Sequence, residues 1–297
     1  MKRVSREQHT HIFAPHVPPV LTVEPGETLA METLDTTHSS VRQPEDVVTY
    51  IRTRKPREVN PAAGPVYVSG AEPGDTLVVE ILDVKLDDFG SLRIMPGRLG
   101  VLTAEMNVPH CRIVRIEGGR AVFSPSISFP VRPMVGVIAT TPAEGEANTA
   151  DPTDVGSNLD HNDVTVGTKV YLPVHVPGAL FGLGDLHASM GDAEVTGNGI
   201  EIGGCTTVRV ELLKGRHWPR PWLETAESWI TTGSAASIED AVQVAVRDMV
   251  DFLAERLAVS REDAYMLVSA RGDVRLGQAC RGMDATARVL FPKLPVR

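Results

Sequence analysis

Residues 24–35 have the sequence EPGETLAMETLD, and residues 72–83 repeat this pattern as EPGDTLVVEILD. Proline followed by glycine fits the central positions of a type II turn, because proline presets φ and glycine accepts a positive φ. The residues after each turn are rich in Thr, Val, Ile and Leu, which favour strands. Each copy therefore predicts a turn that leads into a β-strand, and we interpret the pair as one turn device used twice.

Other strand-like segments are short, and proline or glycine bounds most of them. The chain has 26 Gly and 22 Pro but only 5% aromatic residues, which indicates many turns between short apolar segments. Residues 20–23, 28–33, 76–82 and 166–176 have the length and composition of strands. These segments predict a mainly β body that resembles a sandwich.

The pattern becomes helical after about residue 236. Residues 237–240 (SIED) resemble a capping box with Asp in place of Glu or Gln, and apolar residues then recur at helical spacing up to residue 257. A second start at residues 260–263 (SRED) leads to Gly272, which can supply a left-handed C-cap. The predicted architecture is α+β, mainly β, with a β-sandwich-like body and a helical pair near the C-terminus.

Length and charge limit the organisation and the partners of the protein. The 297 residues divide into a β-rich N-terminal portion (1–160) and a C-terminal α+β portion (161–297), which we expect to pack as one compact unit. The net charge of −9 leaves no basic surplus to neutralise phosphates. Nucleic acid is therefore not an expected partner.

The cysteines and the apolar runs indicate the compartment. Cys111, Cys205 and Cys280 are far apart and form no C-x-x-C pair, so they cannot make a disulfide framework. The basic N-terminus lacks an apolar core, and no run approaches ~18 apolar residues. We expect a cytoplasmic protein that does not span a membrane.

Residues 184–194 (GDLHASMGDAE) hold the densest cluster of possible ligands. Asp185 and His187 are two residues apart, as are Asp192 and Glu194, so each pair shares a face if the segment is extended. If a turn brings the pairs together, three carboxylates and an imidazole suit a divalent cation and a general base. The alternative is a surface hairpin with solvated acids, and spacing alone does not distinguish the two.

Two other segments offer possible partners for this cluster. Residues 8–16 hold three of the nine histidines, and His9 and His11 share one face of an extended strand. Such a run is also typical of exposed histidines that bind metal only adventitiously. Residues 158–163 (NLDHND) read as a polar loop with Asx-type self-capping. The sequence has no Gly-rich phosphate loop, G-x-S-x-G elbow or H-E-x-x-H helix, so nucleotide-binding, serine-hydrolase and zincin functions find no support.

Five stretches, in the expected order, resemble the acetamidase/formamidase family. They are HIFAPHVPP (11–19) with VEPGET (23–28), NPAAGPVYV (60–68) with GAEPGD (70–75), GVIA (136–139) with PAE (142–144), GSNLD (156–160), and GALF (178–181) leading into residues 184–194. The resemblance implies a mainly β homo-oligomer, commonly a dimer, that hydrolyses a short linear amide to a carboxylate and ammonia. The residues that match by position are His11, Asn60, Asp160, Asp185, His187, Asp192, Glu194 and Glu201.

The sequence departs from the family pattern at three places. Ala193 replaces a glycine, Met190 stands where a polar Gln is expected, and residues 36–38 (TTH) replace a small Gly-containing segment. These departures affect the expected amide substrate more than the reaction class, and Met190 would give the pocket apolar bulk.

The implied reaction suggests a metal site. Amide hydrolysis needs an activated nucleophile, a stabilised oxyanion and a proton for nitrogen, and a divalent ion such as Zn²⁺ supplies the first two by lowering the pKa of its water to about 7. We predict that Asp185 and His187 are metal ligands, with Asp160 or His11 completing the set. Zn²⁺ is the expected ion, with Ca²⁺ as the alternative.

Glu194 is then the predicted general base that later delivers a proton to ammonia, and Asp192 would orient a ligand. One alternative is a cysteine nucleophile, since Cys205 lies four residues after Glu201, although a small buried cysteine at the start of a strand is the ordinary explanation. The other is a non-catalytic β-sandwich module with a structural Ca²⁺ ion, against which His187 argues.

Overall fold

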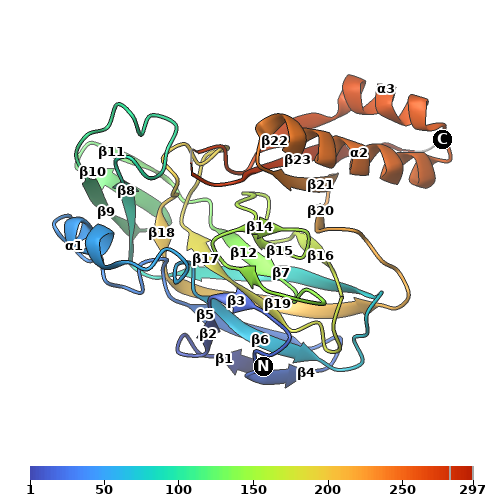
Figure 1. Cartoon of the computed structure of the whole chain (residues 1–297), viewed down its shortest axis with the longest axis horizontal. Coiled ribbons are helices and arrows are strands. Elements are labelled where there is room, and N and C mark those ends of the chain that lie inside the picture. The colour runs from blue at the N-terminus through green and yellow to red at the C-terminus, as the bar shows by residue number, and fades with distance from the viewer. Residues whose placement is uncertain (281, 296–297) are drawn as a thin grey trace.

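A computed structural model describes residues 1–280 and 282–295, and most of its strands lie in two large β-sheets (Figure 1). In spatial order the nine-stranded sheet contains β1 (Lys2–Val4), β5 (Thr28–Thr33), β19 (Gly204–Leu213), β7 (Thr76–Leu86), β16 (Lys169–Pro173), β20 (Trp222–Glu224), β21 (Ser228–Ala235), β23 (Ala285–Pro292) and β22 (Asp273–Leu276). The main path of the twelve-stranded sheet contains β11 (Ile127–Pro130), β10 (Arg120–Ser124), β9 (His110–Glu117), β8 (Phe89–Ile94), β18 (Glu201–Ile202), β17 (Phe181–His187), β12 (Met134–Ala139), β15 (Gly156–Asn158) and β14 (Pro152–Thr153). Beside β17 this sheet also holds β6 (Ala62–Val68), which pairs with β2 (His9–Thr10) and β4 (Leu21–Val23), while β3 (Ile12–Phe13) and β13 (Ala147–Asn148) form a separate pair.

One continuous hydrophobic cluster joins the two large sheets. It includes Leu77 and Ile81 from β7 of the nine-stranded sheet, and Ile138 and Leu183 from β12 and β17 of the twelve-stranded sheet. All four side chains are fully buried. Two sheets that share one apolar core form a sandwich, which confirms the predicted mainly β, sandwich-like body.

Two helices, α2 (Ile238–Leu257) and α3 (Arg261–Arg271), cover the end of the nine-stranded sheet at β21 and β23 (Figure 1, orange). The hydroxyls of Ser237 and Ser260 accept the backbone N–H three residues on, at 3.1 and 3.0 Å, so both predicted N-caps are confirmed. The predicted left-handed cap at Gly272 is wrong, because φ there is −83° and the chain passes directly into β22. Ala258, which ends α2, is left-handed instead, with φ of 52°.

The Pro-Gly turns adopt the predicted conformation. Gly26 and Gly74 have φ of 91° and 93°, and β5 and β7 follow them. The predicted strand over residues 166–176 is too long, because only β16 is extended and a left-handed Gly167 turns the chain just before it. The short helix α1 (Asp46–Thr53) was not predicted.

Strands from both sides of residue 160 share the two sheets. In the nine-stranded sheet β7 pairs with β16 and β19, and in the twelve-stranded sheet β6 pairs with β17. The helices that the structure describes include none that is long and apolar enough to cross a membrane.

Candidate active site

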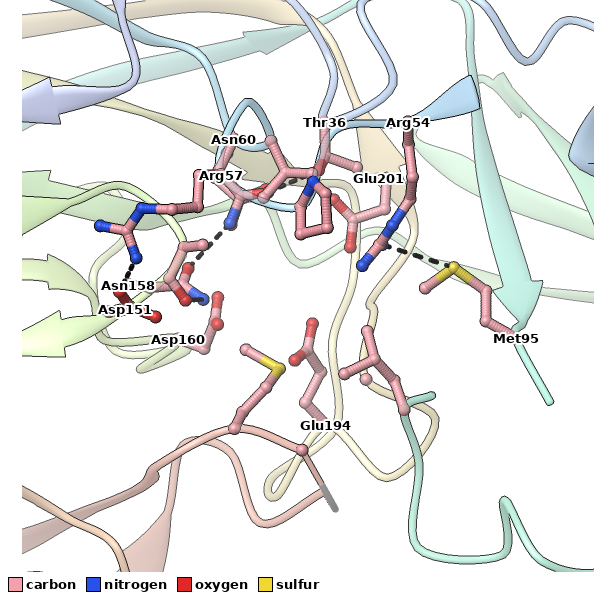
Figure 2. A pocket seen from close by; sticks show the side chains of 18 of the residues that line it. Thr36, Arg54, Arg57, Asn60, Met95, Asp151, Asn158, Asp160, Glu194 and Glu201 are labelled. Carbon is pink, nitrogen blue, oxygen red and sulfur yellow. Dashed lines mark hydrogen bonds and ion pairs between the residues drawn. The ribbon is translucent and has the colours of Figure 1, made fainter. Parts of the chain in front are cut away.

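A cavity of about 280 Å³ is lined by acidic side chains from segments that are remote in sequence. Asp185 comes from β17, Glu201 from β18, Asp160 from the loop after β15, and Glu194 from the loop between β17 and β18. All four are buried. Figure 2 shows Asp160, Glu194 and Glu201 directed toward a common space, with Asn60 at its rim.

The sheet register sets the centre of this group. β17 lies antiparallel to β18, and His187 is the register partner of Glu201. The His187 ring donates its Nε2–H to Glu201 Oε1 over 3.1 Å. Asp185 has a φ of 56°, which interrupts the regular alternation of the strand just before the histidine. The acid group, defined here as Asp160, Asp185, His187, Glu194 and Glu201, is thus assembled around a buried imidazole.

A glycine makes room for two of these carboxylates. A Cβ at Gly136, on β12, would lie 2.5 Å from Asp160 Oδ1 and 2.9 Å from Asp185 Oδ2. Those separations are shorter than van der Waals contact, so any side chain at this position would displace an acid. The absence of a side chain at Gly136 therefore allows Asp160 and Asp185 to approach each other.

The other acids surround the imidazole at slightly longer range. His187 Nδ1 lies 3.8 Å from Asp160 Oδ1, and Nε2 lies 3.8 Å from both Asp185 Oδ1 and Glu194 Oε1. Two sets of possible ligand atoms share the histidine: one contains Asp160 and Glu194, the other Asp185 and Glu201. Within each set the atoms lie within 4.8 Å of one another.

Burial and mutual repulsion shift the pKa values of these carboxyls. Burial raises the pKa of Asp160 to about 6, and burial together with neighbouring acids raises the pKa of Asp185 and of Glu194 well above the usual values. Burial alone would lower the pKa of His187, but Glu201, Asp185 and Asp160 raise it well above its usual value. Such a group keeps all its charges only if a cation compensates them.

The residues present fit a divalent cation. Asp160 Oδ1, Asp185 Oδ1 and His187 Nδ1 are buried and have no hydrogen-bond partner among the described residues. Unpaired buried polar atoms are costly, and a cation beside Asp160 Oδ1 and His187 Nδ1, which lie 3.8 Å apart, would satisfy two of the three. Carboxylate oxygens and one imidazole nitrogen are a donor set that Zn²⁺ accepts.

Two predicted site residues lie outside the acid group. His11 groups with His9 and His38 instead of with Asp160. The side chain of Asp192 is 42% exposed, and its carboxylate accepts hydrogen bonds from Arg288 Nη2 at 2.6 Å and from Asn162 Nδ2 at 2.9 Å. Of the four candidates in residues 184–194, the group therefore contains Asp185, His187 and Glu194.

Met190 was expected to line the substrate pocket. It is buried and does not line this cavity, although it lies with Glu194 along a neighbouring pocket, so its apolar bulk in the substrate pocket stays a prediction. The apolar wall comes from Met95, Leu99 and Met283. No sequence signal singled out Arg93, a buried side chain that lines the cavity. Although burial opposes it, the pKa of Glu201 is lowered, first by His187 and then by the charge of Arg93.

The cysteines lack the surroundings of a nucleophile. Cys205 lies in β19 between β5 and β7 and does not line the cavity. Burial raises its pKa, as it does the pKa of Cys111. Cys280 is nearer the acid group, but burial and the charge of Glu194 raise its pKa to about 12. Each thiol is therefore held in its protonated, weakly nucleophilic form.

Comparison with known proteins gives consistent matches. The chain matches the profile of the Acetamidase/Formamidase family over residues 2–145 and 143–292. The crystal structure of an acetamidase from Bacillus halodurans superposes with a TM-score of 0.93 at 39% sequence identity, covering 98% of this chain and 97% of that one. A formamidase from Methylophilus methylotrophus is 29% identical over 256 residues, and an acetamidase from Mycolicibacterium smegmatis is 26% identical over 269 residues. These two matches cover 67% and 68% of this chain but only 63% and 65% of the relatives, so the chain spans less than two thirds of their length.

Proposed function

Because the chain belongs to the acetamidase/formamidase family, we propose that it hydrolyses short linear amides, such as formamide or acetamide, to a carboxylate and ammonia. The observation that carries this proposal is the acid group, in which four buried carboxyls line a cavity of about 280 Å³ and surround one buried imidazole. An ordinary structural role would not require so many like charges to be buried together.

Asp160, Asp185 and His187 would hold a divalent cation, because each has an unpartnered buried donor atom there. When bound, such an ion lowers the pKa of water and polarises the amide carbonyl. The imidazole favours Zn²⁺ over Ca²⁺, which prefers oxygen ligands. Glu201 fixes the orientation of the His187 ring through their 3.1 Å hydrogen bond, a role for which we had expected Asp192.

Glu194 is the proposed proton carrier. Its carboxyl lines the cavity, and burial, together with the charges of Asp160, Glu201 and Asp185, raises its pKa well above the usual value. A carboxyl whose pKa is shifted toward neutrality can accept a proton from water at Oε1 and return it to the departing nitrogen. This second transfer turns a poor leaving group into ammonia.

The cavity walls favour a small acyl group. Asn60 donates from Nδ2 to Asn158 Oδ1 at 3.1 Å, which fixes its amide at the rim, and Thr36 donates to Asn60 Oδ1. Met95 and Leu99 line the wall with apolar atoms. We therefore propose formamide and acetamide as better substrates than propionamide or benzamide.

An ammonia-release assay over these four amides, combined with metal analysis, tests the proposal. The wild-type protein should release ammonia, contain a divalent ion, and lose activity to a chelator but not to a thiol reagent. His187→Ala should lose both the metal and the activity. Unchanged metal content in that variant would refute the ligand assignment, and no ammonia from any amide would favour a non-catalytic calcium-binding module.

We also propose a homodimer in the cytoplasm. Val101, Leu102 and Val108 are exposed apolar side chains on the loop between β8 and β9, which offers an apolar surface for pairing. Light scattering of the purified protein measures its mass directly. A mass of one chain at all concentrations would refute the dimer.

A further inference from the structure

Three histidines meet away from the acid group. His9 lies in β2, His11 follows it, and His38 comes from the loop after β5. The ring centroids are 5.5 Å apart for His9 and His11, 5.6 Å for His9 and His38, and 5.0 Å for His11 and His38. One ring nitrogen of each lies within 4.8 Å of the other two. The three rings, named here the histidine cluster, can therefore reach a single ion.

Hydrogen bonds to backbone carbonyls fix two of these rings. His9 Nδ1 lies 2.8 Å from the carbonyl oxygen of Arg6, and His38 Nε2 lies 3.2 Å from that of Glu58. A carbonyl only accepts, so the bonded nitrogen carries the hydrogen and the other nitrogen, His9 Nε2 or His38 Nδ1, keeps its lone pair. Metal-binding histidines are oriented in this way.

The third ring also offers a free donor atom. His11 Nδ1 is buried and makes no hydrogen bond to any described residue. This buried nitrogen can therefore bind an ion without losing a hydrogen bond.

We propose that the histidine cluster is a second metal site, which binds a transition-metal ion such as Zn²⁺ through His9, His11 and His38. Three imidazole nitrogens suit Zn²⁺, Co²⁺, Ni²⁺ or Cu²⁺ and do not suit Ca²⁺ or Mg²⁺, which require oxygen ligands. The site is separate from the acid group, with which it shares no residue. Its existence does not depend on the amidase activity.

Such an ion would brace one wall of the cavity. His38 is two residues from Thr36, and the Glu58 carbonyl that holds the His38 ring is two residues from Asn60. Thr36 and Asn60 are hydrogen-bonded to each other and both line the cavity. An ion on the histidine cluster would tie this wall to the N-terminal strand β2, so its role is structural.

Cobalt and zinc titrations of the whole, untagged, chelator-treated chain test the site. His38→Asn removes one ligand with little risk to folding, because His38 is exposed and Asn tolerates its φ of 53°. His9→Gln is the second variant. His16→Gln is the matched control, since His16 is exposed in the same N-terminal run but lies outside the cluster.

The wild type, His16→Gln and His187→Ala should all show the visible absorption of four-coordinate Co²⁺ and a rise in Tm with Zn²⁺. His38→Asn and His9→Gln should lose the part of this absorption, and the one equivalent of bound Co²⁺, that belongs to the histidine cluster, and their Zn²⁺ affinity at this site should fall at least ~10–100-fold. Equal binding by the wild type and the two cluster variants would overturn the proposal. Loss of the cobalt absorption in His187→Ala alone would assign the bound ion to the acid group and would also overturn it.

Discussion

Four residues that line the cavity have left-handed backbones: Asn60, Asp160, Asp185 and Glu194, with φ of 53°, 47°, 56° and 44°. Each such conformation costs about 1–3 kcal/mol and persists only where the surroundings enforce it. Asn and Asp tolerate this region better than Glu, because their short side chains bond locally. Concentration of this strain at one cavity is typical of a functional site, and it directs each side chain inward.

Replacing Gly136 with Ala should disrupt the acid group. The added Cβ would lie 2.5 Å from Asp160 Oδ1, so the carboxylate must move, and overpacking of this kind costs about 1–3 kcal/mol. Metal content and ammonia release should both fall. Gly191→Ala is the control, because no atom lies within 4 Å of its added Cβ, and it should behave as wild type. Normal metal binding by Gly136→Ala would contradict the proposed placement of the two acids.

Cys205→Ser should retain most of the turnover. The residue lies opposite Glu32 and Lys85 in the nine-stranded sheet, and burial raises the pKa of its thiol. Initial rates with formamide, measured against the wild type, check this. Complete loss of turnover in a folded Cys205→Ser protein would restore the cysteine-nucleophile alternative.

Only part of the site was predictable at this scale. The spacing of Asp185 and His187 made them candidates for one site, although it did not distinguish that site from a surface hairpin. Residues 158–163 were a possible partner segment, but only the family resemblance named Asp160 and Glu201, because the register of β17 against β18 and the loop after β15 bring them in from a distance. Sequence spacing could not decide whether Asp160 or His11 joins Asp185 and His187. That choice depends on how segments that are distant in the sequence pack together.

At the scale of elements, β23 and the segment before it hold both loops of the site. Thr286 on β23 donates its hydroxyl to the carbonyl of Leu159 at 2.8 Å, next to Asp160. Arg288, also on β23, is fully buried and donates to Asp192 at 2.6 Å, two residues from Glu194. The C-terminal strand therefore positions two acids that lie 34 residues apart in sequence, from 160 to 194.

Replacing Arg288 with Met should loosen the Glu194 loop. Arg288 also pairs with Asp163, so its removal leaves two acids, 18% and 42% exposed, without their buried partner, and we expect a loss of about 1–3 kcal/mol of stability. We expect a lower Tm and, at a temperature where the variant is folded, a lower kcat with formamide. Differential scanning calorimetry and initial rates measure the two effects.

Arg220→Met is the matched control for this change. Arg220 pairs with Asp154 and with Asp248 of α2, and it does not line the cavity. Its loss should lower Tm while leaving kcat near the wild-type value. An equal loss of kcat in both variants would show that Arg288 contributes stability alone.

Elements with a local signal were predicted better than those without one. The helical pair was predictable because Ser237 and Ser260 supply caps and apolar residues follow at regular spacing. α1 has no side-chain cap, because Glu45 at its N-cap position makes no such hydrogen bond. The sequence before α1 therefore contains no signal for the start of a helix. The end of β16 was not predictable, because tertiary contacts of residues 174–176 determine it.

For the whole molecule, the acid group opposes folding when no cation is bound. The folded-state pKa values of Asp160, Asp185 and Glu194 are raised. A raised pKa contributes stability below the pKa of the unfolded chain and loses it as pH rises through the folded-state pKa. Stability of the metal-free protein should therefore fall as pH rises from about 4 through 6 and beyond, and a divalent cation should restore it.

Glu194→Gln separates this effect from the rest of the chain. The variant keeps the shape of the side chain but cannot ionise, so it escapes the loss of stability that the raised pKa of Glu194 imposes above the unfolded value of 4.5. In metal-free protein its Tm should match the wild type near pH 4 and exceed it increasingly toward pH 8.

Because the same Glu194→Gln change removes the proposed proton carrier, kcat should fall ~10²–10⁴-fold while metal content stays near wild type. Thermal unfolding across pH and ammonia release measure the two properties. A variant that is less stable than wild type at pH 8, or that hydrolyses formamide normally, would show that the carboxylate of Glu194 is neither the destabilising charge nor the proton carrier.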